Sequence, residues 1–253
     1  MGKYDFELEL YDANPLNWIA AKVTENARVL EFGPANGRLT RYLAEEKHCV
    51  IDIVEIDQAS GEEAAEYAKE ALLGSEKGDI EKYYWLELED KYDFIIFADV
   101  LEHLINPWEV LKRCKKVIKP EGKILTSVPN VAHNSIIIDL FNDHFHYNPT
   151  GLLDNTHLRF FTEESFKSMV QQDGWAIVEE RASVIRVGET EIKNTYSDVP
   201  KEVFKALISR PHGNVYQYMF ALTQSSEYLQ GNCERIVSLD RTSYYQADVQ
   251  YDR

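Results

Sequence analysis

The segment at residues 29–40, VLEFGPANGRLT, constrains the fold of this chain more than any other stretch. It begins as a short apolar run typical of a buried strand, and Gly33 and Gly37 then permit a tight turn before a helix starts. A strand–turn–helix unit of this kind brings backbone N–H groups close to a ligand in α/β proteins. The segment therefore predicts an α/β domain with a binding site at the end of its first strand.

The same segment also indicates which ligand is bound. A dinucleotide-binding turn has the pattern Gly-x-Gly-x-x-Gly, whereas here Ala35 stands where the middle glycine would be. Glu31 lies two residues before Gly33, where a carboxylate repels a pyrophosphate and attracts a cation. S-adenosylmethionine carries both an ammonium and a sulfonium group. The segment thus favours this cofactor over NAD.

Composition excludes several classes of partner. A formal net charge of −16 argues against nucleic-acid binding, which requires clustered Lys and Arg side chains. No apolar run is long enough to span a bilayer, so we expect a soluble, cytoplasmic protein without membrane insertion. A homodimer is a candidate assembly. The three cysteines are too far apart for a disulfide framework or a Cys-x-x-Cys metal site: Cys49, Cys114 and Cys233.

Alternating strand and helix patterns continue beyond this first unit. Helical spacing or helix-forming composition marks residues 14–26, 38–46, 62–73, 108–117, 162–174 and 200–209. Strand-like runs mark residues 28–32, 49–56, 92–98, 123–127, 175–180 and 215–222, and a short third strand is expected to end at Asp79 and Ile80. The alternation predicts a Rossmann-like, mostly parallel, seven-stranded sheet with helices on both faces.

Residues 128–162, here called the excursion, interrupt this alternation. The stretch is long, polar and rich in histidine, and it follows the fifth strand, whose carboxyl end faces the expected ligand crevice. It also carries aromatic residues that a bare surface loop does not need. We therefore expect the excursion to cover the active site as a lid.

Several motifs together resemble class I S-adenosylmethionine-dependent methyltransferases over residues 14–222. Residues 31–37 are similar to the first motif of that family, residues 54–57 to the strand whose terminal acid accepts the ribose hydroxyls, and residues 78–80 to the adenine-binding corner. The resemblance implies a methyltransferase domain at 1–224 and a C-terminal extension at 225–253. It implies that the Glu55 carboxylate accepts the ribose hydroxyls of the cofactor, with Asp57 as the alternative. It implies these cofactor-binding residues: Glu31, Gly33, Ala35, Gly37, Glu55, Ile56, Asp79, Ile80, Ala98, Asp99 and His103.

Residues 128–133 and 145–162 resemble a narrower bacterial subgroup associated with glycosyltransferases and surface polysaccharide biosynthesis. This resemblance implies an O-methyltransferase whose acceptor is a sugar, a sugar nucleotide or a related phosphorylated intermediate, with S-adenosylhomocysteine as the second product. Two alternatives stay open. One is a methyltransferase for a quinone-like phenol or another small metabolite, and the other is a catalytically silent scaffold that only binds the cofactor.

A hydroxyl acceptor must lose a proton as it attacks, and histidine is the usual base near neutral pH. We expect His157 or His133 to take this role, with Asp154 orienting His157 from three residues away. Asn130, Tyr147 and Arg159 are expected to contact the acceptor. No metal is favoured, because no spacing resembles a defined metal loop among the available ligands Asp139, Asp143, His144, His146, Asp154 and His157.

Overall fold

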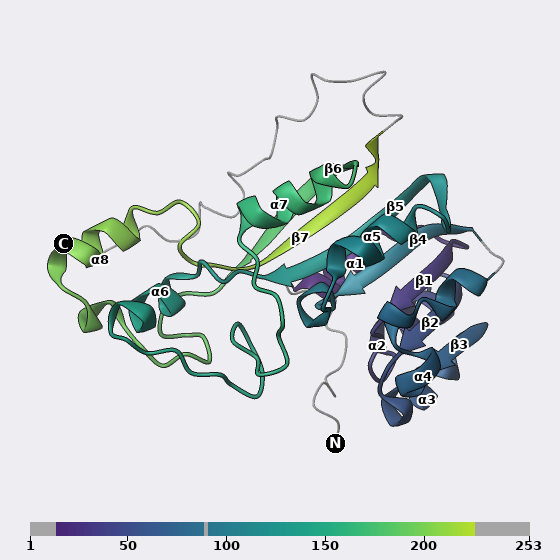
Figure 1. Cartoon of the computed structure of the whole chain (residues 1–253), viewed down its shortest axis with the longest axis horizontal. Coiled ribbons are helices and arrows are strands. Elements are labelled where there is room, and N and C mark those ends of the chain that lie inside the picture. Colours follow the sequence, from purple (N-terminus) through teal and green to yellow (C-terminus); the bar gives the residue numbers. More distant parts are fainter. Residues whose placement is uncertain (1–13, 89–90, 226–253) are drawn as a thin grey trace.

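The chain forms one seven-stranded sheet in a computed structural model that describes residues 14–88 and 91–225. The strand order is β3-β2-β1-β4-β5-β7-β6 (Figure 1). All pairs are parallel except those of β7, which runs antiparallel to both β5 and β6. The strands are β1 (Arg28–Phe32), β2 (Val50–Glu55), β3 (Glu70–Leu73), β4 (Tyr92–Ala98), β5 (Ile118–Pro129), β6 (Trp175–Val184) and β7 (Val215–Gln224).

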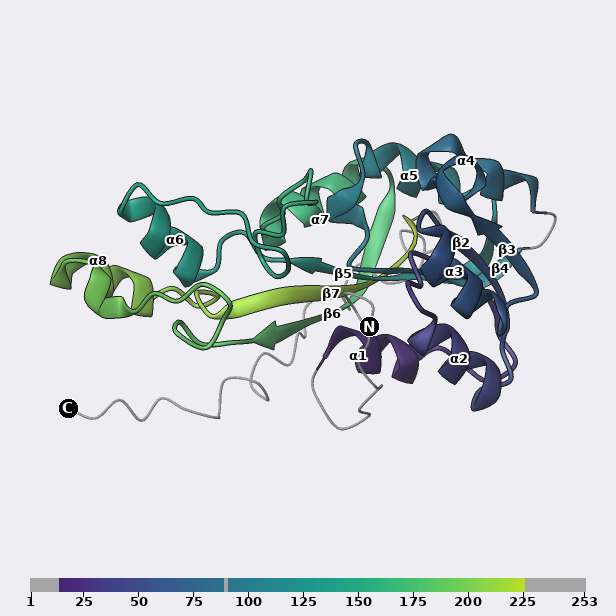
Figure 2. The same ribbon diagram turned by 90° about the horizontal axis from the view of Figure 1, so that it is seen from below.

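Helices cover both faces of the sheet, as Figure 2 shows. Apolar side chains of α1, α2 and α3 pack with β1 and β2 on one face, and those of α5 and α7 pack on the other. The longer helices are α1 (Pro15–Lys22), α2 (Arg38–Glu45), α3 (Gln58–Ala65), α5 (Pro107–Cys114), α6 (Asn134–Phe141), α7 (Glu163–Gln172) and α8 (Lys201–Ile208). The short ones are α4 (Gly74–Lys77), η1 (Ile80–Lys82), η2 (Tyr84–Glu87), η3 (Leu101–His103) and η4 (Tyr196–Asp198).

This architecture confirms the predicted seven-stranded, mostly parallel sheet. The strand order reverses at β1, because the chain moves outward to β2 and β3 and then returns to β4 on the other side. Ligands of doubly wound sheets bind at such a switch point, beyond the carboxyl ends of the strands. The fold thus places the ligand crevice where β1 and β4 end.

One predicted strand and one predicted helix are wrong. The helix expected at 62–73 ends at Ala65 in α3, and residues 70–73 instead form the edge strand β3 beside β2. Asp79 ends no strand, because its carboxylate accepts from the Glu81 N–H and caps η1. Pairing with β2 thus overrides the helix propensity of an Ala- and Glu-rich stretch.

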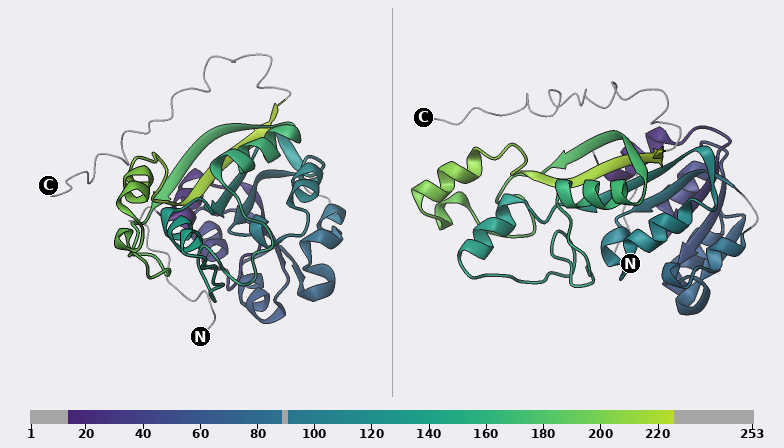
Figure 3. Two further views of the ribbon diagram at one scale, coloured as in Figure 1. Left: turned by 60° about the vertical axis from the view of Figure 1, so that its left-hand side comes forward. Right: turned by 45° about the horizontal axis from the view of Figure 1, so that its top comes forward.

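The excursion forms part of a packed unit. It packs against residues 185–214, which join β6 to β7 at the same end of the sheet, and α6 and α8 lie together there (Figure 3). The Asn194 amide donates to the Ser135 carbonyl (2.7 Å) and to the Asp139 carboxylate (2.6 Å). These contacts hold the excursion as the wall of a small packed unit beyond β5.

Two further observations concern the sequence predictions. Cys49 and Cys114 are buried free thiols. Within residues 14–88 and 91–225, no helix combines the length and the apolar character needed to cross a membrane. Cys233 and the predicted C-terminal extension after Ser225 lie outside the described residues.

Candidate active site

The turn after β1 has the backbone conformation that its glycines require. Gly33 and Gly37 have φ values of +64° and +80°, and Ala35 between them has a φ of +51°. Only glycine adopts this left-handed region without strain, so Ala35 occupies a position that suits the glycine usual in the first motif. Gly37 also lies against α3, where an added Cβ would come within 2.6 Å of the Ala64 Cα.

We expect Gly37→Ala to destabilise the protein by about 2–5 kcal/mol, since it adds left-handed strain to a backbone clash. Gly188→Ala is the matched control. Gly188 also has a positive φ, of +90°, but its nearest neighbour would lie 3.7 Å from an added Cβ. Strain alone predicts a loss of about 1–2 kcal/mol there. Urea unfolding measures both variants, and equal losses would contradict the close approach of the turn to α3.

Glu31, at the end of β1, is a buried acid. Its side chain accepts a hydrogen bond from the Thr40 hydroxyl (2.8 Å), and it is only 2% exposed. Burial, with a smaller contribution from the charge of Glu55, raises the pKa of Glu31 to about 7. A cation bound nearby would favour the ionised form, so this carboxyl group suits a positively charged cofactor.

The raised pKa predicts a pH-dependent stability. Glu31 favours the fold in its protonated form, so this contribution is present below the usual pKa of 4.5 and is lost as pH rises through about 7. We expect Glu31→Gln to be more stable than the natural chain at pH ~8, by up to about 3 kcal/mol, and equally stable at pH ~4. Urea midpoints at the two pH values test this. A gain of the same size at both would contradict the raised pKa.

Glu55, at the end of β2, has both carboxylate oxygens directed at backbone N–H groups. Oε2 accepts from Ala35 N–H and Oε1 from Asp57 N–H, each at 2.9 Å. Each oxygen has a second lone pair, so the carboxylate retains the capacity to accept two hydroxyl groups. The Asp57 side chain instead caps α3 through Ser60 N–H. The geometry therefore favours Glu55 over Asp57 for the ribose.

The loop that carries Asp79 lies against the same strand end. Gly78 packs so closely on Glu55 that an added Cβ would meet the Glu55 carbonyl oxygen at 1.9 Å. This contact brings Asp79, which is half-buried, beside the end of β2. Ile80 is buried and its carbonyl accepts from the Trp85 indole, whereas Ile56 is 59% exposed just beyond Glu55. An apolar and an acidic side chain thus flank the position where an adenine would lie.

Asp99 follows β4 and half-buried Ala98, and it has a positive φ of +55°. The Ser127 hydroxyl donates to one oxygen of its carboxylate (2.7 Å), and the Gln217 amide donates to the other (2.9 Å). Burial raises the pKa of Asp99, although these two hydrogen bonds oppose the shift. The structure therefore fixes a fourth acid at the same crevice, after Glu31, Glu55 and Asp79. The part of Gln217 in holding it had no signal in the sequence.

A group formed by Glu102, His103 and His157, here called the Glu-His-His cluster, adjoins Asp99. One potential ligand atom from each lies within 4.8 Å of the others, and the rings of His103 and His157 meet edge to face at 4.8 Å. Glu102 is 1% exposed, and its carboxylate oxygens have no hydrogen-bond partner among the described residues. Burial, followed by the charge of Asp99, raises the pKa of Glu102 well above its usual value.

The excursion positions His157 within this cluster. The Glu102 carbonyl accepts from the N–H groups of Leu158 (2.8 Å) and Arg159 (2.9 Å), which attaches the excursion to η3. Asp154 is buried, and its carboxylate accepts from the N–H and the hydroxyl of Thr156. Asp154 thus shapes the turn that presents His157.

His133 has a role different from the predicted catalytic one. It is fully buried, its Nε2 donates to the Ile185 carbonyl (2.8 Å), and its Nδ1 accepts from Ser135 N–H at the start of α6. Burial also lowers the pKa of His133. With both nitrogens engaged, His133 caps α6 and ties the excursion to residue 185, which leaves His157 as the catalytic candidate.

The three residues expected to contact the acceptor do not come together. The Asn130 amide donates to the Val215 carbonyl, and its oxygen accepts from Ala132 N–H, so Asn130 braces the start of the excursion. Tyr147 is 56% exposed, with its ring against Phe145. The Arg159 guanidinium donates to the Ile105 carbonyl and lies over the ring of Trp108: its partners are protein groups.

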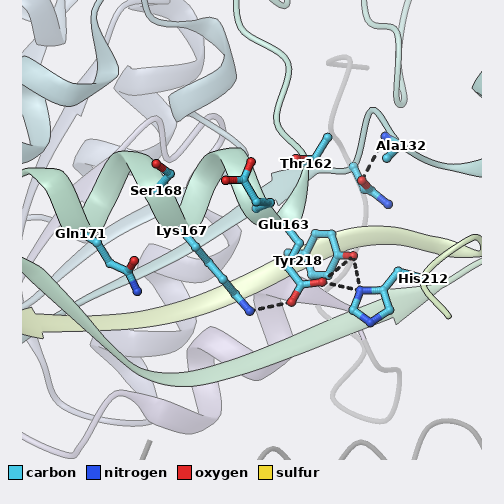
Figure 4. Close-up of a pocket in the computed structure, with 10 residues that line it drawn as sticks. Ala132, Thr162, Glu163, Lys167, Ser168, Gln171, His212 and Tyr218 are labelled. Atoms are coloured by element: carbon cyan, nitrogen blue, oxygen red, sulfur yellow. Dashed lines mark hydrogen bonds and ion pairs between the residues drawn. The ribbon is translucent and has the colours of Figure 1, made fainter. Parts of the chain in front are cut away.

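A cavity of about 560 Å³ lies elsewhere, along α7 and β7 (Figure 4). Its charged groups are paired, since Lys167 contacts both Glu163 and Glu180 at 2.6 Å and His212 contacts Glu163. None of the strand-end acids lines it. We therefore place the chemistry at the ends of β1, β2 and β4 rather than in this cavity.

The strand order, the glycine turn after β1 and the acids at the strand ends define a class I S-adenosylmethionine-dependent methyltransferase. The acids fit a cofactor that offers a ribose diol and positive charge. Comparison with known proteins agrees, because the family model described as "Methyltransferase domain" matches residues 10–180. The chain belongs to this family, which confirms the predicted class.

The individual proteins to which this chain is similar share only low sequence identity with it. The chain is 28% identical over 125 residues to a "Ubiquinone biosynthesis O-methyltransferase" of Pseudomonas fluorescens, covering 48% of this chain and 53% of that one. The chain thus matches only about half the length of this relative. Solved methyltransferase structures share the fold, and two of them serve as examples. The CcbJ methyltransferase of Streptomyces caelestis has a TM-score of 0.55 at 14% identity, covering 83% of this chain and 88% of that one. A SAM-dependent methyltransferase of Archaeoglobus fulgidus has a TM-score of 0.53 at 18% identity, covering 83% and 94%.

Proposed function

We propose that this methyltransferase transfers the methyl group of S-adenosylmethionine to a hydroxyl oxygen of a small hydrophilic acceptor held at the Glu-His-His cluster. The observation that carries the proposal is the convergence of His157, from the excursion, with Glu102 and His103 beside the strand-end acids. A hydroxyl acceptor needs groups that remove or neutralise its proton, which imidazoles and carboxylates do.

Glu55 would hold the ribose, and Glu31 would face the positively charged part of the cofactor. Bound S-adenosylmethionine supplies a methyl group on a positive sulfonium. The acceptor oxygen then forms a bond to the methyl carbon while the carbon–sulfur bond breaks. Its electron pair stays on sulfur, and the hydroxyl proton leaves through the cluster. The chain itself contributes alignment of the acceptor and exclusion of water, an effect worth about 7–11 kcal/mol in favourable cases.

A sugar, a sugar nucleotide or a related intermediate of surface polysaccharide biosynthesis is the acceptor class that we favour. The resemblance of the excursion to the glycosyltransferase-associated subgroup supports it. The acceptor side also carries polar groups, with Asp154 and Thr156 next to His157. A phenol of the quinone type is the second candidate, favoured by the similarity to ubiquinone biosynthesis O-methyltransferases.

The test has two stages. Calorimetric titration with S-adenosylmethionine and, separately, with NAD establishes the cofactor. A panel of nucleotide sugars, free sugars and dihydroxy phenols is then assayed for S-adenosylhomocysteine release, with the methylated product identified by mass spectrometry. Methylation of a sugar compound supports the proposal, and methylation of a phenol alone supports the second candidate. Cofactor binding without methylation of any acceptor would favour the silent scaffold.

A further inference from the structure

We infer that Glu102, His103 and His157 bind one divalent metal ion, and that this ion holds the hydroxyl oxygens of the acceptor. The second half of this inference rests on the proposed function, whereas the first half stands on the geometry alone. The cluster differs from the set of ligands considered from the sequence, because that set contained neither Glu102 nor His103.

The first observation is the carboxylate of Glu102. It is buried, at 1% exposure, and neither oxygen has a hydrogen-bond partner among the described residues. The Glu102 carbonyl accepts two backbone hydrogen bonds from the excursion, which therefore packs directly against this residue. A buried carboxylate without donors is costly unless a cation compensates it. Asp99 and Asp154 add negative charge around it.

The second observation is the spacing of the three side chains. His157 Nε2 and Glu102 Oε1 are 4.0 Å apart, too far for a hydrogen bond between them. A transition-metal ion lies about 2.0–2.2 Å from each nitrogen or oxygen ligand, so two ligands on opposite sides of it are about 4 Å apart. The potential ligand atoms of all three residues lie within 4.8 Å of one another. The 4.0 Å gap between Glu102 and His157 therefore fits an ion between them better than a direct contact. The 4.8 Å limit is slightly wider than the ~4.4 Å that two opposite ligands can span, so the farthest pair would move closer by a few tenths of an ångström on binding.

The donor set indicates both the ion and its use. Two imidazoles and one carboxylate suit Mn²⁺, Fe²⁺, Co²⁺ or Zn²⁺ better than Ca²⁺ or Mg²⁺. Three protein ligands leave coordination positions open, as in catalytic rather than structural sites. His103 is the most exposed member of the three, so the site has an approach from its side. An acceptor with two adjacent hydroxyl groups, in a sugar or a catechol, would fill two open positions.

Such an ion would lower the pKa of the hydroxyl that it binds. The hydroxyl proton would then leave to solvent on the partly exposed His103 side of the cluster, the oxygen would bond to the methyl carbon, and the carbon–sulfur bond would break with its electron pair on sulfur. His157 acts as a neutral ligand in this scheme, and no protein base has to take the proton.

The experiment measures metal binding without turnover. The full chain is treated with a chelator, and Mn²⁺ is titrated while electron paramagnetic resonance reports free Mn²⁺, with and without S-adenosylhomocysteine. We expect one Mn²⁺ per chain, with affinity at least about 100-fold lower in Glu102→Gln and in His157→Asn. His212→Asn is the matched control, since His212 contacts Glu163 far from the cluster in sequence, and it should bind Mn²⁺ like the natural chain.

Each variant must also bind S-adenosylmethionine within about threefold of the natural chain, which shows that it is folded. The inference is overturned if the natural chain binds no stoichiometric Mn²⁺, or if both cluster variants bind it unchanged. Full methylation by the chelated protein would also overturn the metal role while leaving the proposed function intact. If the natural chain does not bind S-adenosylmethionine, the proposed function itself is contradicted. A sugar diol or a catechol that tightens Mn²⁺ binding identifies the source of the hydroxyl groups.

Discussion

Glu55→Ala is expected to lower the affinity for S-adenosylmethionine at least about 100-fold. The carboxylate would accept both ribose hydroxyls, and hydrogen bonds to a charged group are each worth about 1.5–3 kcal/mol. The substitution also leaves Ala35 N–H and Asp57 N–H without the acceptor that now fixes them. The loss therefore combines missing ligand contacts with a looser turn. Calorimetric titration of the two proteins measures it directly.

Asp57→Asn is the control that separates the two acids. Asp57 caps α3 by accepting from Ser60 N–H, and asparagine caps a helix about equally well. The variant removes one negative charge close to Glu55 but keeps the local structure, so the affinity should change less than about threefold. A large loss of affinity in Asp57→Asn together with a small loss in Glu55→Ala would show that Asp57, not Glu55, binds the ribose hydroxyls.

The sequence predicted the sheet well where burial decides the structure. β1 and β4 are short, mostly apolar runs that are buried along most of their length, and such runs bounded by turn residues favour strands of a covered parallel sheet. β3 was missed because its residues favour helix and lie at the edge of the sheet, half exposed. Only its pairing with β2, which sequence periodicity does not report, makes it a strand.

The local geometry of the candidate site was predictable where an acid and the backbone turn beside it belong to one short motif. Glu31, Gly33 and Gly37 are of this kind. His133 was not, because its role depends on the carbonyl of Ile185, 52 residues away. Glu102 was visible in the sequence as the neighbour of His103, but its burial and its unpartnered oxygens appear only once the excursion covers it.

His157→Ala is expected to reduce kcat by about 100- to 10,000-fold and to leave the Kd for S-adenosylmethionine unchanged. His157 belongs to the excursion and contacts Glu102 and His103. Whether it takes the proton or binds a metal ion, its loss removes activation of the acceptor while the ribose and adenine contacts remain. Steady-state rates with the acceptor found in the panel, together with calorimetry, measure the two quantities separately.

His144→Ala provides the comparison within the same segment. His144 is an exposed histidine of the excursion whose ring lies near His146, and it is not a member of the Glu-His-His cluster, so kcat should stay within about twofold. Equal losses in both variants would mean that the excursion merely needs to be intact. A weaker Kd in His157→Ala would place this histidine against the cofactor. Loss of kcat in His157→Ala alone would place the acceptor at the junction of η3 and the excursion, because His157 is the excursion's contribution to that cluster.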